Sequence, residues 1–162
     1  MRPGIVFINI FGKFLPMDFY KGQYSISTNK EKLDIEYIHQ FLSHSYWAEN
    51  IPFEIVKRSV EGAICFGVYD NNKQIGFARV VTDRATFGYL ADVFIDENYR
   101  GRGLSKWLME VIVGHPALQG FRSWQLATND AHGLYARFGF ATPDKPERIM
   151  RKVVPDVYKK NN

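Results

Sequence analysis

One stretch, residues 89–112, constrains the fold most, because the spacing of its apolar residues changes partway along. Tyr89 to Ile95 is an apolar run of strand length that is rich in aromatic and β-branched residues. After a short polar break comes Arg100-Gly101-Arg102-Gly103. From Leu104 onward the apolar residues recur at helical spacing, until Gly114 ends the pattern. The stretch therefore predicts a strand, a glycine-rich turn and a helix with one buried face.

Such a turn is suited to binding an anion. The first amide N–H groups of a helix have no intrahelical partner, and the positive end of the helix dipole lies there. Gly101 and Gly103 let a phosphate approach the backbone, and Arg100 and Arg102 add positive charge. The spacing excludes a Walker loop, which reads G-x-x-x-x-G-K-(S/T), and Lys106 occupies the place of the third glycine in a dinucleotide fingerprint.

The pattern that remains, Arg100-x-x-Gly103-x-Ser105, resembles the acyl-CoA pyrophosphate motif of the GNAT-type N-acyltransferases, (Q/R)-x-x-G-x-(G/A). Ser105 departs from that motif but is small. A second segment, AHGLYARFGF over residues 131–140, resembles the family's later motif, A-x-x-L-Y-x-(K/R)-x-G-(F/Y). The two segments stand in the family's order, and the resemblance extends from about residue 24 to about residue 154.

The predicted fold class is α/β (α+β mixed), with a central, mostly antiparallel mixed sheet of six to seven strands and about four helices on both faces. The patterns predict strands over 24–28, 63–69, 74–81, 86–95, 123–128 and 148–154, and helices that start near 35, 53, 104 and 131. The resemblance implies that strands 86–95 and 123–128 are parallel and splay apart at their carboxyl ends.

Length and composition predict one globular domain. The chain has 162 residues, of which 46% are hydrophobic and 15% aromatic, enough for a substantial core. We expect residues 19–162 to form the single domain and residues 1–18 to be an N-terminal extension. Residues 1–14 fall outside the family pattern and are expected to be dispensable for folding, with Met17 as an alternative start.

Charge and cysteine content exclude several classes of protein. The net charge of +4 is too small to indicate nucleic acid as a partner, and no apolar run is long enough for a bilayer. Cys65, the single cysteine, rules out an internal disulfide and is expected to be a buried structural thiol. These features favour a cytoplasmic protein without a membrane partner or a metal site, and a homodimer is left open. The basic tail over 145–162 is expected to be solvated.

The resemblance implies acetyl-CoA as the acyl donor and a primary amine that attacks it directly in a ternary complex. The backbone of Val93, Phe94 and Ile95 would bind the pantetheine arm. The pyrophosphate would be held by the turn and the first helical residues, namely Arg100, Gly101, Arg102, Gly103, Leu104 and Ser105. Tyr135 would contact the cofactor and donate a proton to the departing thiolate.

The general base is less clear from the sequence. Ala91 stands where the polyamine acetyltransferases carry a glutamate, so Asp92 is the nearest carboxylate. Strand alternation predicts that Asp92 points to the opposite face from Ala91, and a purely structural role for it stays open. His132 is a weaker candidate base. Thr128 replaces an asparagine that is common in the family, which puts one cofactor contact in doubt.

The polar and aromatic loop after the first helix is the candidate acceptor site. In the family this link walls the acceptor pocket, so Tyr46, Trp47 and Glu49 are predicted to touch substrate. Trp47 anchoring the loop to the core is an equal alternative. Two other classes of function also stay open, a non-catalytic acyl-CoA-binding regulatory domain and a basic module that binds nucleic-acid phosphates.

Overall fold

A computed structural model of the chain describes residues 15–159, so the predictions about residues 1–14 lie outside the described part. Its centre is a six-stranded sheet in the order β1-β2-β3-β4-β5-β6. The strands are β1 (Asp18–Lys21), β2 (Tyr24–Ser27), β3 (Ile64–Asp70), β4 (Lys73–Thr82), β5 (Phe87–Ile95) and β6 (Ser123–Gln125). Neighbouring strands are antiparallel except for the parallel pair β5–β6. The predicted mixed sheet is confirmed.

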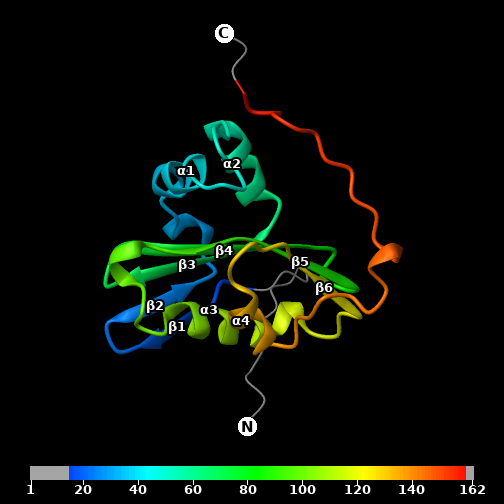
Figure 1. Cartoon of the computed structure of the whole chain (residues 1–162). Helices are drawn as coiled ribbons and strands as arrows, with labels where there is room; N and C mark the ends of the chain where they lie inside the picture. The colour runs from blue at the N-terminus through cyan, green and yellow to red at the C-terminus, as the bar shows by residue number, and fades with distance from the viewer. Residues whose placement is uncertain (1–14, 160–162) are drawn as a thin grey trace.

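Helices cover both faces of the sheet (Figure 1). They are α1 (Ile35–Ser43) and α2 (Phe53–Glu61) on one face, and α3 (Leu104–Gly114) and α4 (His132–Ala136) on the other. Short 3₁₀ helices are η1 (Lys30–Lys32), η2 (Glu97–Tyr99), η3 (Pro116–Leu118) and η4 (Pro146–Arg148). The local signals behave as the sequence predicts, since the Asp34 side chain caps α1 by accepting the Tyr37 N–H.

Alternation along the strands divides the core into two clusters. Ala78 and Val80 of β4 pack with the side of the sheet that α3 covers, whereas Phe77 packs with the side that α1 and α2 cover. Leu108 and Ile112 of α3 have no exposed surface. The helical spacing seen from Leu104 onward therefore corresponds to the buried face of α3.

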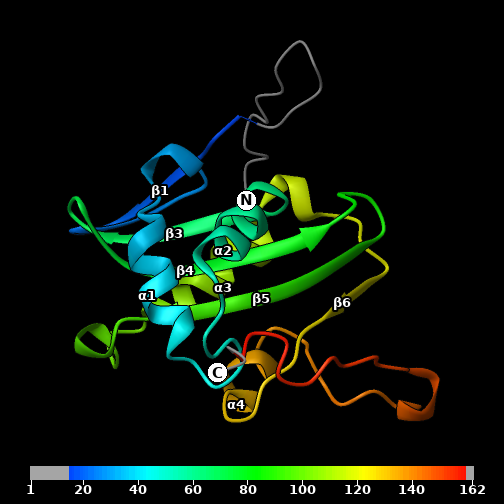
Figure 2. The same cartoon turned by 90° about the horizontal axis from the view of Figure 1, so that it is seen from above.

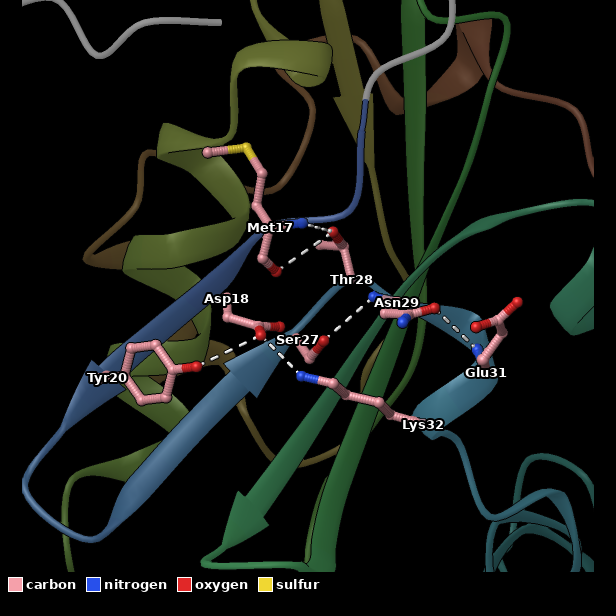
Figure 3. Close-up of polar contacts among 8 residues, drawn as sticks. All are labelled: Met17, Asp18, Tyr20, Ser27, Thr28, Asn29, Glu31 and Lys32. Atoms are coloured by element: carbon pink, nitrogen blue, oxygen red, sulfur yellow. Dashed lines mark hydrogen bonds and ion pairs between the residues drawn. The ribbon is translucent and has the colours of Figure 1, made fainter. Parts of the chain in front are cut away.

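The start of the described chain is tied to the sheet edge (Figure 3). The Met17 N–H donates to Thr28 Oγ1 (2.8 Å), and the Thr28 N–H donates back to the Met17 carbonyl (2.9 Å). Lys32 Nζ lies 2.6 Å from the Asp18 carboxylate, which also accepts from the Tyr20 hydroxyl. Strand β1 was not predicted, because four mostly exposed residues show no alternating pattern.

The parallel pair β5–β6 is short and then opens (Figure 2). Its register runs over Phe87↔Ser123, Gly88↔Trp124 and Tyr89↔Gln125. A Cβ at Gly88 would lie 3.0 Å from the Trp124 ring, so this close approach needs glycine. The predicted parallel pairing is confirmed. β6 ends at Gln125 rather than at residue 128, because the chain turns toward α4.

The predicted strand over 148–154 is wrong. Residues 149–154 form no strand, and Met150 is 96% exposed. Apolar, β-branched residues form a strand only where a neighbouring edge supplies hydrogen bonds, and β6 is only three residues long before the chain turns toward α4. Instead the tail runs past the β6 edge to the level of α1 and α2 (Figure 1).

Candidate active site

Two clefts open where β5 and β6 diverge. The first cleft, about 900 Å³, lies between α1, the end of β5, the glycine-rich turn and α4. The second cleft, about 610 Å³, lies between β4, β5, the segment after β6 and the C-terminal tail. Both volumes suit small molecules. Residues that line both clefts are Tyr46, Trp47, Val93, Asp130, Ala131 and Tyr135. The clefts therefore meet around Tyr135 and Val93.

The glycine-rich turn closes one end of the first cleft. Gly101 and Gly103 have φ of +74° and +75°, a conformation that strains residues with a Cβ. Gly103 caps α3, whose first amide N–H groups have no intrahelical partner. Arg100 and Ser105, on either side of these glycines, line the cleft, and Arg100 Nε donates to the Ile95 carbonyl (3.3 Å). The predicted strand, turn and helix form one end of this cleft, and the free amides of a helix N-terminus are chemically suited to an anion.

The predicted cofactor residues separate into two groups. The six that line the first cleft are Val93, Phe94, Ile95, Arg100, Ser105 and Tyr135, whereas Gly101, Arg102, Gly103 and Leu104 do not line it. Leu104 is buried in the core. Arg102 donates to the Tyr24 hydroxyl (2.9 Å) and the Asn98 carbonyl (3.1 Å), and its guanidinium lies 5.0 Å from the Tyr99 ring centre. The arginine charge that lines the cleft is that of Arg100.

A β-bulge on β5 directs Asp92. The β4–β5 register shifts between Phe77 and Arg79, and Asp92 has a φ of +53°. Its carboxylate accepts from Arg79 Nε and from Trp47 Nε1 (3.1 Å). Arg79 pairs with Ala91 across the ladder, so Asp92 and Ala91 share one face. The prediction of opposite faces is wrong, because the extra residue of the bulge breaks the alternation.

The α1–α2 loop is fastened to both diverging strands. The Trp47 N–H reaches Asp92 on β5, and the Tyr46 hydroxyl accepts from the Asn129 N–H (3.2 Å) after β6. The two rings pack edge to face at 4.9 Å, and Trp47 is 43% exposed. Trp47 thus anchors the loop through its N–H while its ring lines both clefts. Glu49, in the same loop, lines neither.

Tyr135 lies at the junction of the clefts. Its side chain is 8% exposed and packs edge to face on Phe140. Burial raises the pKa of its hydroxyl to about 12, and the nearby Tyr46 and Asp130 add to the rise. The phenol therefore stays protonated at neutral pH, as a proton donor must.

Residues 61–142 match the model of the acetyltransferase (GNAT) domain. The chain belongs to the GNAT acetyltransferase family. A GNAT-family protein of Xanthomonas campestris, solved at 1.40 Å, is 47% identical, covers 85% of this chain and 97% of its own, and superposes with a TM-score of 0.82.

Two further relatives extend the comparison. A Gibberella zeae protein assigned to the acetyltransferases is 29% identical over 145 residues, which covers 75% of this chain and 81% of that protein. A Clostridium acetobutylicum structure that contains acetyl-CoA shares the fold, with 15% identity, a TM-score of 0.57 and coverage of 75% and 91%.

The first cleft is also lined by two residues, Tyr37 and Phe41, that were not predicted from the sequence. The Tyr37 hydroxyl is buried near Asp96, and burial, followed by the Asp96 charge, raises its pKa. Phe41 stacks on Phe94 at 3.7 Å. Tyr37 and Phe41 stand four residues apart on α1, a spacing that could have revealed a second face of that helix.

Of the other residues singled out in the sequence, Cys65 and His132 lie outside the two clefts and Thr128 lines the second. Cys65 is buried, as predicted, and burial raises the pKa of its thiol to about 12. His132 is exposed and lines neither cleft, whereas Thr128 lines the second cleft and accepts the Ala131 N–H (3.0 Å). Within residues 15–159 no group of three metal-ligating side chains occurs. None of the described helices is long and apolar enough to cross a bilayer.

Proposed function

We propose that the protein is an N-acetyltransferase that transfers an acetyl group from acetyl-CoA to a primary amine in a ternary complex. The observation that carries this proposal is the meeting of two clefts at Tyr135, one of which ends on the glycine-rich turn. Membership of the GNAT family supports it. The first cleft would take the thioester and the second the amine, so the two substrates reach Tyr135 from different sides.

The backbone that lines the first cleft supports the proposal that acetyl-CoA binds there. Beyond Tyr89 the β6-facing backbone groups of β5 lack a strand partner, and a peptide-like pantetheine arm can bond to them at Val93, Phe94 and Ile95.

The pyrophosphate would lie at the amides of Gly103, Leu104 and Ser105, with the Arg100 guanidinium beside it. Gly101 would let it approach the backbone. Arg102 would contribute charge from the rim while Tyr24 holds it. In the Clostridium acetobutylicum relative, the same fold holds acetyl-CoA.

The transfer itself forms one bond and breaks another. The amine nitrogen attacks the thioester carbonyl carbon, a C–N bond forms, and the C–S bond breaks with its electron pair on sulfur. Backbone N–H groups of β5 stabilise the oxyanion that develops on the carbonyl oxygen. Tyr135 donates its proton to the sulfur, which leaves as the free thiol, and is reprotonated from solvent.

In the proposal Asp92 acts on the acceptor side of the site. It lines the second cleft, and its bonds to Arg79 and Trp47 hold its carboxylate in place. Each oxygen keeps a lone pair that can accept the amine's proton, directly or through a water molecule. Replacing Asp92 with Asn removes that acceptor while keeping the shape of the side chain. We expect kcat of the variant to fall in steady-state assays, while acetyl-CoA affinity stays close to that of the parent.

A turnover assay tests the function directly. The full chain is incubated with acetyl-CoA and a panel of primary amines, and free thiol and acetylated product are both measured. Amine-dependent thiol release with a matching acetylated product supports the proposal. Stoichiometric acetyl-CoA binding without turnover of any amine would favour the regulatory-domain alternative instead.

A further inference from the structure

Arg79 offers hydrogen-bond donors to the second cleft that the protein does not use. Its side chain is only 20% exposed, and it bonds to Asp92 through Nε. Its two terminal nitrogens have no hydrogen-bond partner within residues 15–159, although Arg79 lines the cleft. Guanidinium donors that are largely removed from water gain most from an acceptor with matching geometry, and carboxylate and phosphate have that geometry.

Arg151 brings a second positive charge to the same cleft from the C-terminal tail. It lines the cleft, is exposed, and forms no ion pair with any residue between 15 and 159. The tail then returns toward the α1–α2 loop. A hydrogen bond to Asp156 is the main cause of the raised pKa of Lys159, and the carboxylate of Glu49, in that loop, contributes. Figure 1 shows the tail passing beyond β6 toward the level of α1 and α2, and Arg151 is the residue of this tail that lines the second cleft.

The second cleft is also lined by two carboxylates, Asp92 and Asp130, which have different neighbours. Asp92 is already paired with Arg79. Asp130 lines both clefts, and its charge adds to the burial that raises the pKa of Tyr135. The cleft therefore has a carboxylate near Tyr135, where an ammonium would approach, and guanidinium donors in the region lined by Arg79 and Arg151.

We infer that the acceptor is a small primary amine that also carries an anionic group, a carboxylate or a phosphate, and that Arg79 and Arg151 bind this group. The inference rests on the proposed function and specifies the substrate class of the same site. The anionic group would hold the molecule in the second cleft while its amine points to Tyr135. A neutral amine of the same length would lose these charge-assisted hydrogen bonds.

A matched substrate series tests the inference. Ethanolamine, β-alanine and O-phosphoethanolamine have the same two-carbon spacer and differ in the terminal group, and leucine can be compared with leucinamide. We expect kcat/KM for an anionic amine to exceed that of its neutral counterpart about 10-fold. The carboxylate and phosphate arms show which anion the site takes. Equal or faster turnover of the neutral amines overturns the inference and leaves the proposed function standing.

Tail variants test the assignment to Arg151. Arg151→Gln should lower the ratio of anionic to neutral kcat/KM about 10-fold, mainly through KM. Lys152→Gln removes the neighbouring exposed charge, which lines neither cleft, and should leave the ratio unchanged. Equal effects of the two substitutions would overturn the specific site in favour of general tail charge.

Arg79→Lys keeps a positive charge beside Asp92 but loses the planar fork, so it should also lower the ratio. Its melting temperature serves as the check on folding.

Calorimetric titration of the amines into the protein–CoA complex needs no turnover. Saturable binding of the anionic amines, weakened by Arg151→Gln, supports the inference even where acetylation fails. Absence of binding by all three anionic amines, β-alanine, O-phosphoethanolamine and leucine, overturns it.

Discussion

The antiparallel centre of the sheet and its parallel end differ in how completely their strands are paired. β3 and β4 pair through seven residue positions, from Ile64↔Val80 to Asp70↔Lys73, whereas β5 and β6 pair through three. In the antiparallel part, β3 and β4 satisfy each other's backbone hydrogen bonds, and buried side chains cover both of its faces. In the parallel part, β5 and β6 diverge, so that unpaired backbone groups and two clefts lie between them. One sheet thus provides stability at the antiparallel centre and recognition at the parallel end, and substitutions should separate the two.

Phe66→Ala should have the largest effect, and it should fall on stability. Phe66 lies on β3 with no exposed surface and packs edge to face on His115 at 5.5 Å. Losing such a ring from a close-packed core costs about 3–5 kcal/mol of unfolding free energy. Urea unfolding measures it. Tyr20→Ala on β1, where the ring is 74% exposed, is the control and should change stability by less than about 0.5 kcal/mol.

Tyr135→Phe should show the reverse behaviour at the parallel end. Only a hydroxyl is removed, so the ring keeps its packing on Phe140, and the melting temperature and acetyl-CoA affinity should change little. Loss of the proton donor should lower kcat about 10²-fold, with water as a partial substitute. Steady-state kinetics with any accepted amine measure this effect, and Tyr20→Phe is the control. A kcat within about twofold of the parent would remove Tyr135 from the mechanism.

Gly103→Asp should weaken cofactor binding next in order. An aspartate there puts a negative charge where pyrophosphate is proposed to lie, and φ of +75° strains any side chain. We expect an affinity loss of about 10-fold to 100-fold for CoA by calorimetry. Gly120→Asp introduces the same side chain at φ of +78° outside both clefts, so it isolates the strain. Equal affinities in the two variants would contradict the site assignment.

Acidification should produce the smallest effect, a loss of stability through His115, which packs on Phe66 of β3. Burial lowers the pKa of His115 to about 4, and its Nε2 has no hydrogen-bond partner among residues 15–159. Between pH about 6.5 and about 4 the imidazole is protonated in the unfolded chain and neutral in the folded chain. The free energy of unfolding therefore falls as the pH drops through this window. We expect a loss of about 1–2 kcal/mol after allowing for partial solvation.

Unfolding measured across this pH range for the parent and for His115→Asn tests the assignment. Asparagine can still accept the Ala117 N–H that His115 Nδ1 caps, but it does not titrate. The variant is expected to be less stable at neutral pH and to have a flatter pH dependence. Parallel curves for the two proteins would show that His115 is not the responsible group.

Much of the site can be predicted from the sequence because its signals are local. The change from strand to helical spacing, the two glycines and Arg100 lie within one short stretch, and each forms the structure its backbone preferences favour. Tyr135 was identified in the same way, through a motif of consecutive residues. The strand predicted over 74–81 is also local in origin, and in the structure it is the central part of β4.

What only the tertiary structure decided depends on residues far apart in the chain. The bulge at Asp92 exists where β4 and β5 fall out of register, so Arg79 and Trp47 meet the same carboxylate, which strand alternation could not show. Residues 149–154 have the composition of a strand, but they pair with no strand among the described residues 15–159. Pairing across a sheet and the path of a tail are set by contacts between residues far apart in the chain. The local spacing of side chains does not predict the free energy of such contacts.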